Sequence, residues 1–214
     1  VNRLSSLGIV LYSTGGTYTF IDQLGLKVNL VEDLTEYPSI FGGRVKTLHP
    51  KIFGGILNRR ENARDIAEKG EYDIPDIDLV IVDLYPFEET VSYGGTTEEI
   101  IEKIDIGGIA LIRGAAKNHK DIVIIPSMDD YSTLLDILKK NHGQTTLAER
   151  TQLATRAFRI SSHYDTMINK YLEGTLEDCN PLNNFNLSVP TVKSLRYGEN
   201  PHQDGRFFGN LDDI

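Results

Sequence analysis

The feature of this sequence that most restricts its fold is an alternation of short apolar runs with segments of helical periodicity. The apolar runs end at glycine or proline and lie at Gly8–Gly16, Leu26–Val31, Asp78–Phe87 and Asp121–Pro126. Helical patterns occupy Thr17–Gly25, Glu61–Lys69, Thr96–Lys103, Ile109–Asn118, Tyr131–Asn141 and Leu147–Leu172. Strands that are apolar on both faces are covered on both sides, and parallel strands need helical crossovers. The sequence therefore predicts an α/β fold with a parallel sheet between helix layers.

The pattern changes near Leu172. The stretch GTLEDCNPLNNFNLSVPT is rich in asparagine, glycine and proline and has little period, which indicates a linker over residues 173–194. We therefore expect one domain over residues 1–172 and the start of another over 195–214. At the other end, VNRLSSLG has no initiator methionine and has the pattern of a helix already under way, so we expect further chain before Val1.

The charge and the cysteine content exclude several classes of protein. With 31 acidic and 22 basic side chains the net charge is −9, which disfavours broad binding to nucleic acid or to an anionic membrane. The single cysteine, Cys179, has no partner for an internal disulfide, which favours a reducing, cytoplasmic setting. The five histidines show no metal-ligand spacing, so we expect no metal site. No apolar run approaches the ~20 residues that span a bilayer.

A glycine turn between a predicted strand and a predicted helix is the first candidate site. It comprises Ser13, Thr14, Gly15, Gly16 and Thr17. The first amides of a helix lack partners within the helix and carry its positive dipole end, so such a turn suits a phosphate. An ordinary strand–helix turn with a Ser/Thr cap is the alternative.

The run FGGRVKTLHPKI gathers cations in an otherwise acidic chain. Its glycine pair and its proline indicate a constrained turn, and in an extended backbone Arg44 and Lys46 would point to the same side, toward one anion. A solvated basic loop is the alternative; His49 and Lys51 are expected to support the structure.

Two further motifs follow predicted strands or open helices. DLYPF places Tyr85 at the carboxyl end of the strongest strand run, where ligands bind in open α/β sheets, although an aromatic plug over the core fits equally well. In IDIGG, Asp105 precedes a helix and two glycines leave amides free for an oxyanion, the alternative being a simple N-cap. Lys117, Asn118 and His119 follow at the end of that helix.

Taken in order, the motifs resemble one family. STGGT, GRVKTLHPKI, DLYPF, IDIGG, AAKNHK and LRYGENPHQ occur as in the bifunctional purine-biosynthesis proteins that combine IMP cyclohydrolase with AICAR transformylase. The resemblance implies a methylglyoxal-synthase-like fold for the cyclohydrolase part, a homodimer and a purine nucleotide substrate. It implies no cofactor for ring closure, and 10-formyltetrahydrofolate for the transformylase part.

The resemblance also implies roles for individual residues in closing formyl-AICAR to IMP. Those implied as catalytic are Lys46, Tyr85, Asp105 and Lys117. Those implied to bind substrate are Ser13, Thr14, Gly15, Gly16, Thr17, Arg44, Thr47, Asp83, Ile106, Gly107 and Gly108, with Arg196 and Tyr197 in the transformylase motif. We expect the STGGT loop, Arg44 and Thr47 to hold the 5′-phosphate, and Lys46 with the Ile106 and Gly107 amides to face the oxyanion. Asp105 and Lys117 would move protons, and Tyr85 would hold the formyl group or the base.

The sequence departs from the family in three places. The family's opening strand and S-x-x-D-K-T-G loop are not found, so we expect the sheet to lack a strand. Asp83 stands where the family commonly has Asn, which removes a donor. The transformylase's Lys-His pair is not reached by Ile214, so formyl transfer is not expected from this chain alone.

Two questions stay open from the sequence. In one straight helix Asp105 and Lys117 would lie ~18 Å apart; either Gly107-Gly108 bends the chain back, which the glycines favour, or a second subunit contributes. Methylglyoxal synthase and a regulatory phosphate-binding module share the phosphate loop and remain alternative functions.

Overall fold

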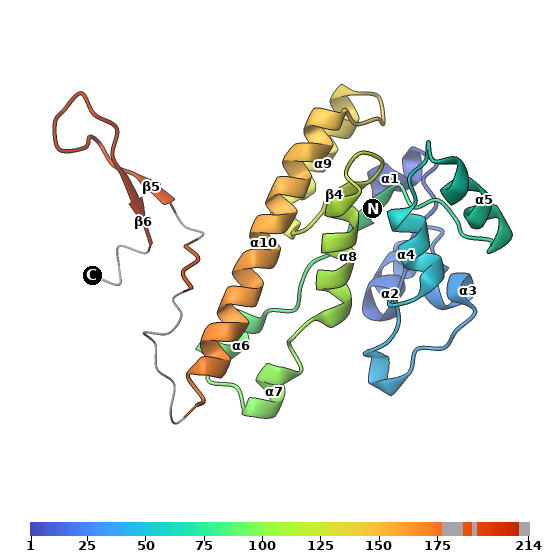
Figure 1. The fold of residues 1–214 in the computed structure, drawn as a ribbon, viewed down its shortest axis with the longest axis horizontal. Coiled ribbons are helices and arrows are strands. Elements are labelled where there is room, and N and C mark those ends of the chain that lie inside the picture. The colour runs from blue at the N-terminus through green and yellow to red at the C-terminus, as the bar shows by residue number, and fades with distance from the viewer. Residues whose placement is uncertain (177–185, 190–191, 210–214) are drawn as a thin grey trace. The chain divides into compact units, whose positions relative to one another are not determined.

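The computed structural model describes residues 1–176, 186–189 and 192–209 of the chain (Figure 1). It contains two compact units, Val1–Phe158 and Arg159–Ile214, and the division falls within one long helix. The boundaries at residues 172 and 194 expected from composition stay a prediction. Cys179 and much of the expected linker lie outside the described residues.

The first unit has the predicted fold class, an α/β arrangement with parallel strands. Strand β1 (Tyr12–Ser13) pairs in parallel with β2 (Asn29–Leu30), and β3 (Leu79–Ile81) pairs in parallel with β4 (Val123–Ile125). In the described part of the chain these pairs form two separate ladders. Each strand is shorter than the apolar run that predicted it, because helices begin within or directly after the runs.

Helices connect and cover these strands. In chain order they are α1 (Asn2–Ser6), α2 (Gly15–Gln23), α3 (Val31–Thr35), η1 (Phe41–Gly43), α4 (Pro50–Leu57), α5 (Ala63–Glu71), α6 (Phe87–Ser92), α7 (Thr97–Ile101), α8 (Ile106–Lys117), η2 (Met128–Asp130), α9 (Tyr131–Lys140) and α10 (Leu147–Glu173). The six helical patterns in the sequence correspond to α2, α5, α7, α8, α9 and α10. The pattern analysis missed α3, α4 and α6, which are eight residues or shorter.

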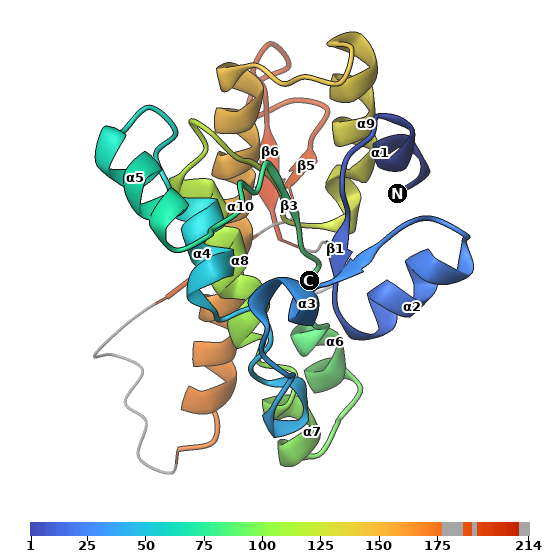
Figure 2. The same ribbon diagram turned by 90° about the vertical axis from the view of Figure 1, so that its right-hand side faces the viewer.

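Helix α8 lies at the centre of the core. Its side chains Ile112, Ala115 and Ala116 are fully buried, as are Ile124 and Ile125 of β4. Buried residues of α4, of α9 and of the first half of α10 join the same cluster. Figure 2 shows β3 with α4 and α8 on one side and α9 on the other. The helix that carries IDIGG and the start of AAKNHK is therefore anchored in the core of the unit.

Capping residues set where several helices begin. The ring of His49 accepts from the amide of Lys51 at 3.2 Å, and Pro50 occupies the first position of α4, where its missing N–H costs nothing. Asn62 caps α5, and Thr96 with Glu99 forms a capping box on α7. Lys51 pairs with Glu36 at 3.1 Å. His49 and Lys51 thus support the turn, as expected.

The second unit is described in part. Strands β5 (Val192–Ser194) and β6 (Arg206–Phe208) form an antiparallel hairpin in which Val192 faces Phe208. The LRYGENPHQ motif forms the loop of this hairpin, closed by bonds from the Leu195 amide to Gly205 O at 2.9 Å and from the Gly198 amide to Gln203 O at 2.7 Å.

No helix in the described part of the chain combines the length and the apolar character needed to cross a membrane.

Candidate functional site

The STGGT loop joins the end of β1 to the start of α2. Ser13 ends the strand, Thr14 is the N-cap, and α2 begins at Gly15 with a φ of +50°. The Thr14 side chain makes no capping hydrogen bond, so the ordinary Ser/Thr cap expected as the alternative is not formed. Since the first amides of a helix have no partner within it, the loop presents several donors at the carboxyl edge of β1.

Lys46 points at this loop. Its Nζ lies 3.5 Å from the position that a Cβ would take on Gly15. The turn that leads to Lys46 has left-handed backbone at Phe41, Gly42 and Gly43, with φ of +51°, +64° and +91°. A Cβ on Gly43 would lie 2.8 Å from the ammonium of Lys46, so Gly43 leaves the space that the lysine occupies.

Arg44 and Lys46 do not point to the same side, as their two-residue spacing had predicted they would. The backbone of Arg44 is helical, with φ −68° and ψ −22°, so the same-side rule for extended chain does not apply. Its guanidinium instead pairs with the carboxylate of Glu102, just beyond α7. The side chains of Arg44 and Glu102 are 65% and 56% exposed, so this ion pair lies at the surface of the site.

The start of α8 lies against the same turn. Thr47 Oγ1 is 3.2 Å from the position that a Cβ would take on Gly107, so the hydroxyl touches the first turn of the helix. Asp105 is the N-cap of α8, and its Oδ1 accepts from the amide of Gly108 at 2.6 Å. That amide is therefore used within the helix, whereas those of Ile106 and Gly107 precede the intrahelical bonds.

Asp105 also joins the DLYPF loop to this site. Partial burial raises the pKa of its carboxyl group, an effect opposed by hydrogen bonds from the backbone amides of Gly108 and Tyr85. A carboxyl group with a raised pKa is better suited to proton transfer near neutrality than an ordinary aspartate. Asp105 is therefore the N-cap of α8, the alternative role considered for it in the sequence, and its carboxyl group also has an environment suited to carrying a proton.

The side chain of Tyr85 is 54% exposed, so it is not a plug over the core. Lys103 places its Nζ 5.8 Å from the centre of the Tyr85 ring. Asp83 turns toward the next loop, where its Oδ1 accepts from the amide of Met128 at 3.3 Å. Burial, and secondly the charge of Asp83, raises the pKa of Tyr131.

The expectation that Gly107-Gly108 bends the chain back is wrong. Helix α8 is continuous from Ile106 to Lys117, so Asp105 and Lys117 lie at opposite ends, ~18 Å apart. The glycines serve close packing instead, because a Cβ on Gly108 would meet the Asp105 carboxyl carbon at 2.8 Å.

Lys117 lines a separate pocket of about 490 Å³ in the first unit. Its walls are largely apolar, with Phe53 and Leu57 from α4, Arg113 from α8 and Phe158 from α10. Arg113 lies over the Phe158 ring, 5.7 Å from its centre. In this chain, Lys117 is thus not part of the group formed by Lys46, Thr47 and Asp105.

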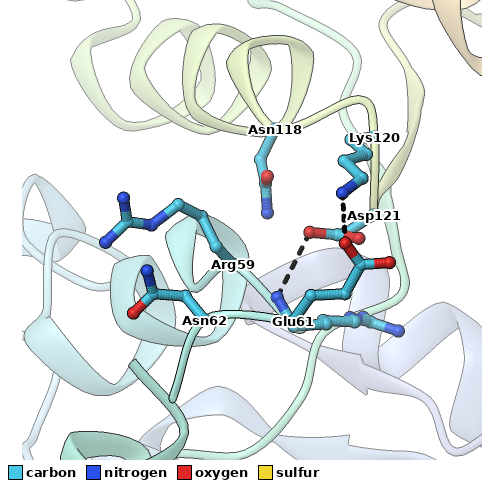
Figure 3. A pocket seen from close by; sticks show the side chains of 7 residues that line it. Arg59, Glu61, Asn62, Asn118, Lys120 and Asp121 are labelled. Atoms are coloured by element: carbon cyan, nitrogen blue, oxygen red, sulfur yellow. Dashed lines mark hydrogen bonds and ion pairs between the residues drawn. The ribbon is translucent and has the colours of Figure 1, made fainter. Parts of the chain in front are cut away.

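A polar pocket of about 280 Å³ lies near the amino-terminal edge of β3 and β4 (Figure 3). Two ion pairs lie at this pocket, Lys120 with Glu61 at 2.6 Å and Arg60 with Asp78 at 2.7 Å. Asn118 lines this pocket and donates from Nδ2 to Ile56 O at 2.8 Å and to Asn58 O at 2.9 Å. Asn118 of the AAKNHK motif therefore ties the end of α8 to the end of α4.

Sequence reasoning missed Glu102, Lys103 and the close approach of Gly43. No motif marked Glu102 or Lys103, and their contacts with Arg44 and Tyr85 join segments distant in sequence. Arg196 and Tyr197 lie in the hairpin loop of the second unit, with Tyr197 54% exposed. Within the described residues, no three His, Cys, Asp or Glu side chains converge in a way that could hold a metal ion.

Comparison with known proteins agrees with this organisation. Residues 1–110 match the family model of the MGS-like domain, and residues 115–213 match that of the AICARFT/IMPCHase bienzyme. The bifunctional purine biosynthesis protein PurH of Bacteroides thetaiotaomicron is 55% identical over 99% of this chain, and that of Bacillus subtilis is 42% identical over 97%.

The chain spans only 41% and 40% of the length of those two relatives. A solved structure, the crystal structure of ForH, is 37% identical and superposes with a TM-score of 0.67, covering 80% of this chain and 88% of that one. The chain therefore belongs to the family of the bifunctional purine biosynthesis protein PurH, the AICARFT/IMPCHase bienzymes, and carries the MGS-like domain of that family.

Proposed function

We propose that the first unit closes the six-membered purine ring, converting formyl-AICAR to IMP with loss of water. One observation carries the proposal: the ammonium of Lys46 lies against the STGGT loop while its neighbour Thr47 lies against the start of α8. A phosphate donor set, a cation and a partly buried carboxyl group are thereby brought to one place. A module that only binds phosphate would need the first of these alone.

Ring closure makes demands that these residues meet. The carboxamide nitrogen attacks the formyl carbon, negative charge develops on the formyl oxygen, and a proton leaves the nitrogen. The first-turn amides of α2 and the hydroxyl groups of Ser13, Thr14 and Thr17 bind the 5′-phosphate. Lys46 and the amides of Ile106 and Gly107 stabilise the oxyanion.

Asp105 takes the proton from the carboxamide nitrogen and passes it to the oxyanion, and the hydroxyl group so formed leaves as water with the proton of the formamide nitrogen. Tyr85 orients the formyl group. Asp83 accepts from the Met128 amide through Oδ1 and is given no role in this chemistry. The step needs no cofactor. The 10-formyltetrahydrofolate implied for the family belongs to the transformylase part, of which Arg196 and Tyr197 form a beginning.

The test is to supply formyl-AICAR to the full-length protein and to follow IMP by its absorbance. We expect IMP to form, and Lys46→Ala to lower kcat by about 10²–10³-fold with a smaller change in KM, as for loss of one oxyanion donor. Lys27→Ala removes an exposed lysine of the same unit and is the control. Normal turnover by Lys46→Ala would remove Lys46 from the mechanism. Methylglyoxal formed from a triose phosphate, without IMP, would support methylglyoxal synthase instead.

The position of Lys117 leads us to propose a homodimer in which this lysine serves the site of the second copy. The ~18 Å length of α8 keeps Lys117 from the Asp105 of its own chain. Ile106, Arg113 and Lys117 are all exposed and lie at helical spacing along one stripe of α8. Two such helices packed antiparallel about a two-fold axis would place the Lys117 end of one beside the Asp105 end of the other.

Mixing inactive variants tests this exchange. Asp105→Asn and Lys117→Ala, each expected to be inactive alone, should regain activity when they are denatured and refolded together, because one mixed site then keeps both groups. Each variant refolded alone is the control. Absence of recovered activity in a sample shown by mass to contain mixed dimers would rule out the exchange.

A further inference from the structure

Glu102, a residue outside the sequence motifs, contacts Arg44, the arginine that the sequence predicted to bind phosphate. Arg44 lies one position after Gly43, which borders the ammonium of Lys46, and that ammonium borders the STGGT loop. The guanidinium of Arg44 is paired with the carboxylate of Glu102. Glu102 therefore forms an ion pair with the cation that we expect a bound phosphate to use.

The segment that carries Glu102 borders the site elsewhere as well. The next residue, Lys103, lies over the ring of Tyr85, and Asp105, three residues after Glu102, accepts from the Tyr85 amide. Glu102 is thus at the rim of the proposed site, on the chain that leads into α8.

The pair is built so that a phosphate can replace it. Both side chains are more than half exposed, and exposed ion pairs contribute little because solvent and salt screen them. A phosphate monoester carries ~1.5–2 negative charges and three acceptor oxygens. It fits the planar arginine fork as a carboxylate does and carries more charge.

We propose that Glu102 is a positioning residue that competes with the 5′-phosphate of the nucleotide for Arg44. In the empty site it holds the guanidinium at the rim. When the nucleotide binds, the guanidinium turns to the phosphate and leaves an uncompensated carboxylate nearby, which weakens retention of the nucleotide. The inference rests on the proposed function, and it adds Arg44, which the sequence predicted at the phosphate, to the ligands of the 5′-phosphate.

The experiment measures binding of IMP and of inosine to the full-length protein by calorimetry. Glu102→Gln keeps the shape of the side chain and removes its charge. We expect it to bind IMP more tightly by up to about five-fold, the worth of an exposed ion pair, with a smaller gain in high salt. Inosine, which lacks the phosphate, should bind both proteins equally.

Two controls separate this effect from a general change of charge. Glu98→Gln removes the same charge at an exposed position of α7 and should leave IMP affinity unchanged. In an Arg44→Gln background, Glu102→Gln should have no further effect, because the competed cation is gone.

Unchanged or weaker IMP binding by Glu102→Gln overturns the competition, as does an equal gain for inosine or for Glu98→Gln. If the wild-type protein forms IMP in the absorbance assay and binds it in the calorimeter, the proposed function stands while this inference falls. A wild-type protein that neither forms nor binds IMP overturns both.

Discussion

The two adjacent glycines before Arg44 provide a matched pair of substitutions that tests the role of Lys46. Gly42 and Gly43 both have left-handed backbone, with φ of +64° and +91°. A Cβ on Gly42 meets nothing within 4 Å, whereas a Cβ on Gly43 meets Cε and Nζ of Lys46, the latter at 2.8 Å. Replacing either glycine by alanine strains the backbone, but only the second displaces the lysine.

The two substitutions should therefore have similar effects on folding stability but different effects on kcat. Each alanine should cost about 1–2 kcal/mol of folding stability, the penalty for an L-residue in the left-handed region. Lys46 is flexible and can move aside, so Gly43→Ala should shift its ammonium by about 1 Å rather than unfold the turn. A misplacement of that size is worth up to about 10²-fold in rate. We therefore expect Gly43→Ala to lower kcat for IMP formation about 10- to 100-fold, and Gly42→Ala to change it little.

The assay is steady-state IMP formation together with urea unfolding of both variants. Equal stability loss with unequal kcat is the expected result. If both variants lose activity in proportion to their stability, the turn serves only the fold and the reasoning about Lys46 is refuted. Full activity of Gly43→Ala would equally refute it.

Three further predictions concern the fold around this site. Asn118→Ala should cost about 2–3 kcal/mol of unfolding free energy, since one buried and one partly buried hydrogen bond are lost. Asn118→Asp should cost more, because a carboxylate then faces carbonyl oxygens; urea unfolding measures both. Gly55→Ala should cost about 1–3 kcal/mol in thermal unfolding, because its Cβ would lie 2.6 Å from Pro75 O. Gly70→Ala in helix α5 is the control: its Cβ would meet nothing within 4 Å, so this variant should be neutral or stabilising. The raised pKa of Asp105 means that the folded state binds more protons than the unfolded state, so its contribution to stability falls as pH rises from about 4 to the folded-state pKa. Asp105→Asn, which keeps a capping side chain, should therefore gain stability relative to wild type across that window; a difference that is constant with pH in urea titrations would contradict the shift.

The sequence predicted most of the element order because apolar runs mark its strands and its longer helices are periodic. It missed α3, α4 and α6, since helices of two turns or fewer give too little period to recognise. It placed strands too broadly for a related reason. An apolar run records burial rather than hydrogen bonding, and Phe87 is buried at the start of a helix although it lies in the strongest strand run.

The site was predictable where chemistry depends on local chain geometry. STGGT lies between β1 and α2, and Asp105 opens α8, both as the motifs indicated. Arg44 was not predictable, because the same-side rule needs an extended backbone and its backbone is helical. The partner Glu102 lies 58 residues away in sequence, and only the tertiary fold joins the two.

The glycines of IDIGG show how one residue type supports opposite interpretations. A glycine pair permits a reversal of the chain, and a reversal would have brought Lys117 back to Asp105. The same absence of a Cβ also permits close packing, which is what α8 uses: Thr47 lies against Gly107, and the Asp105 carboxyl group lies against Gly108. A sequence alone does not distinguish these two uses, because both depend only on the missing side chain.

Hydrogen bonds hold both ends of α8, and they fix the distance between Lys117 and Asp105. At the start, Asp105 bonds to the Gly108 amide; at the end, Asn118 bonds to the carbonyl oxygens of Ile56 and Asn58. Between them the helix lies in the core, so neither unwinding nor a kink shortens the ~18 Å between Asp105 and Lys117 without breaking buried contacts. A proton-transfer role for Lys117 at the site of its own chain is therefore incompatible with the fold. If Lys117→Ala abolishes ring closure while the chain stays folded, the result supports the proposed action from a second copy, which the mixed-dimer experiment then tests.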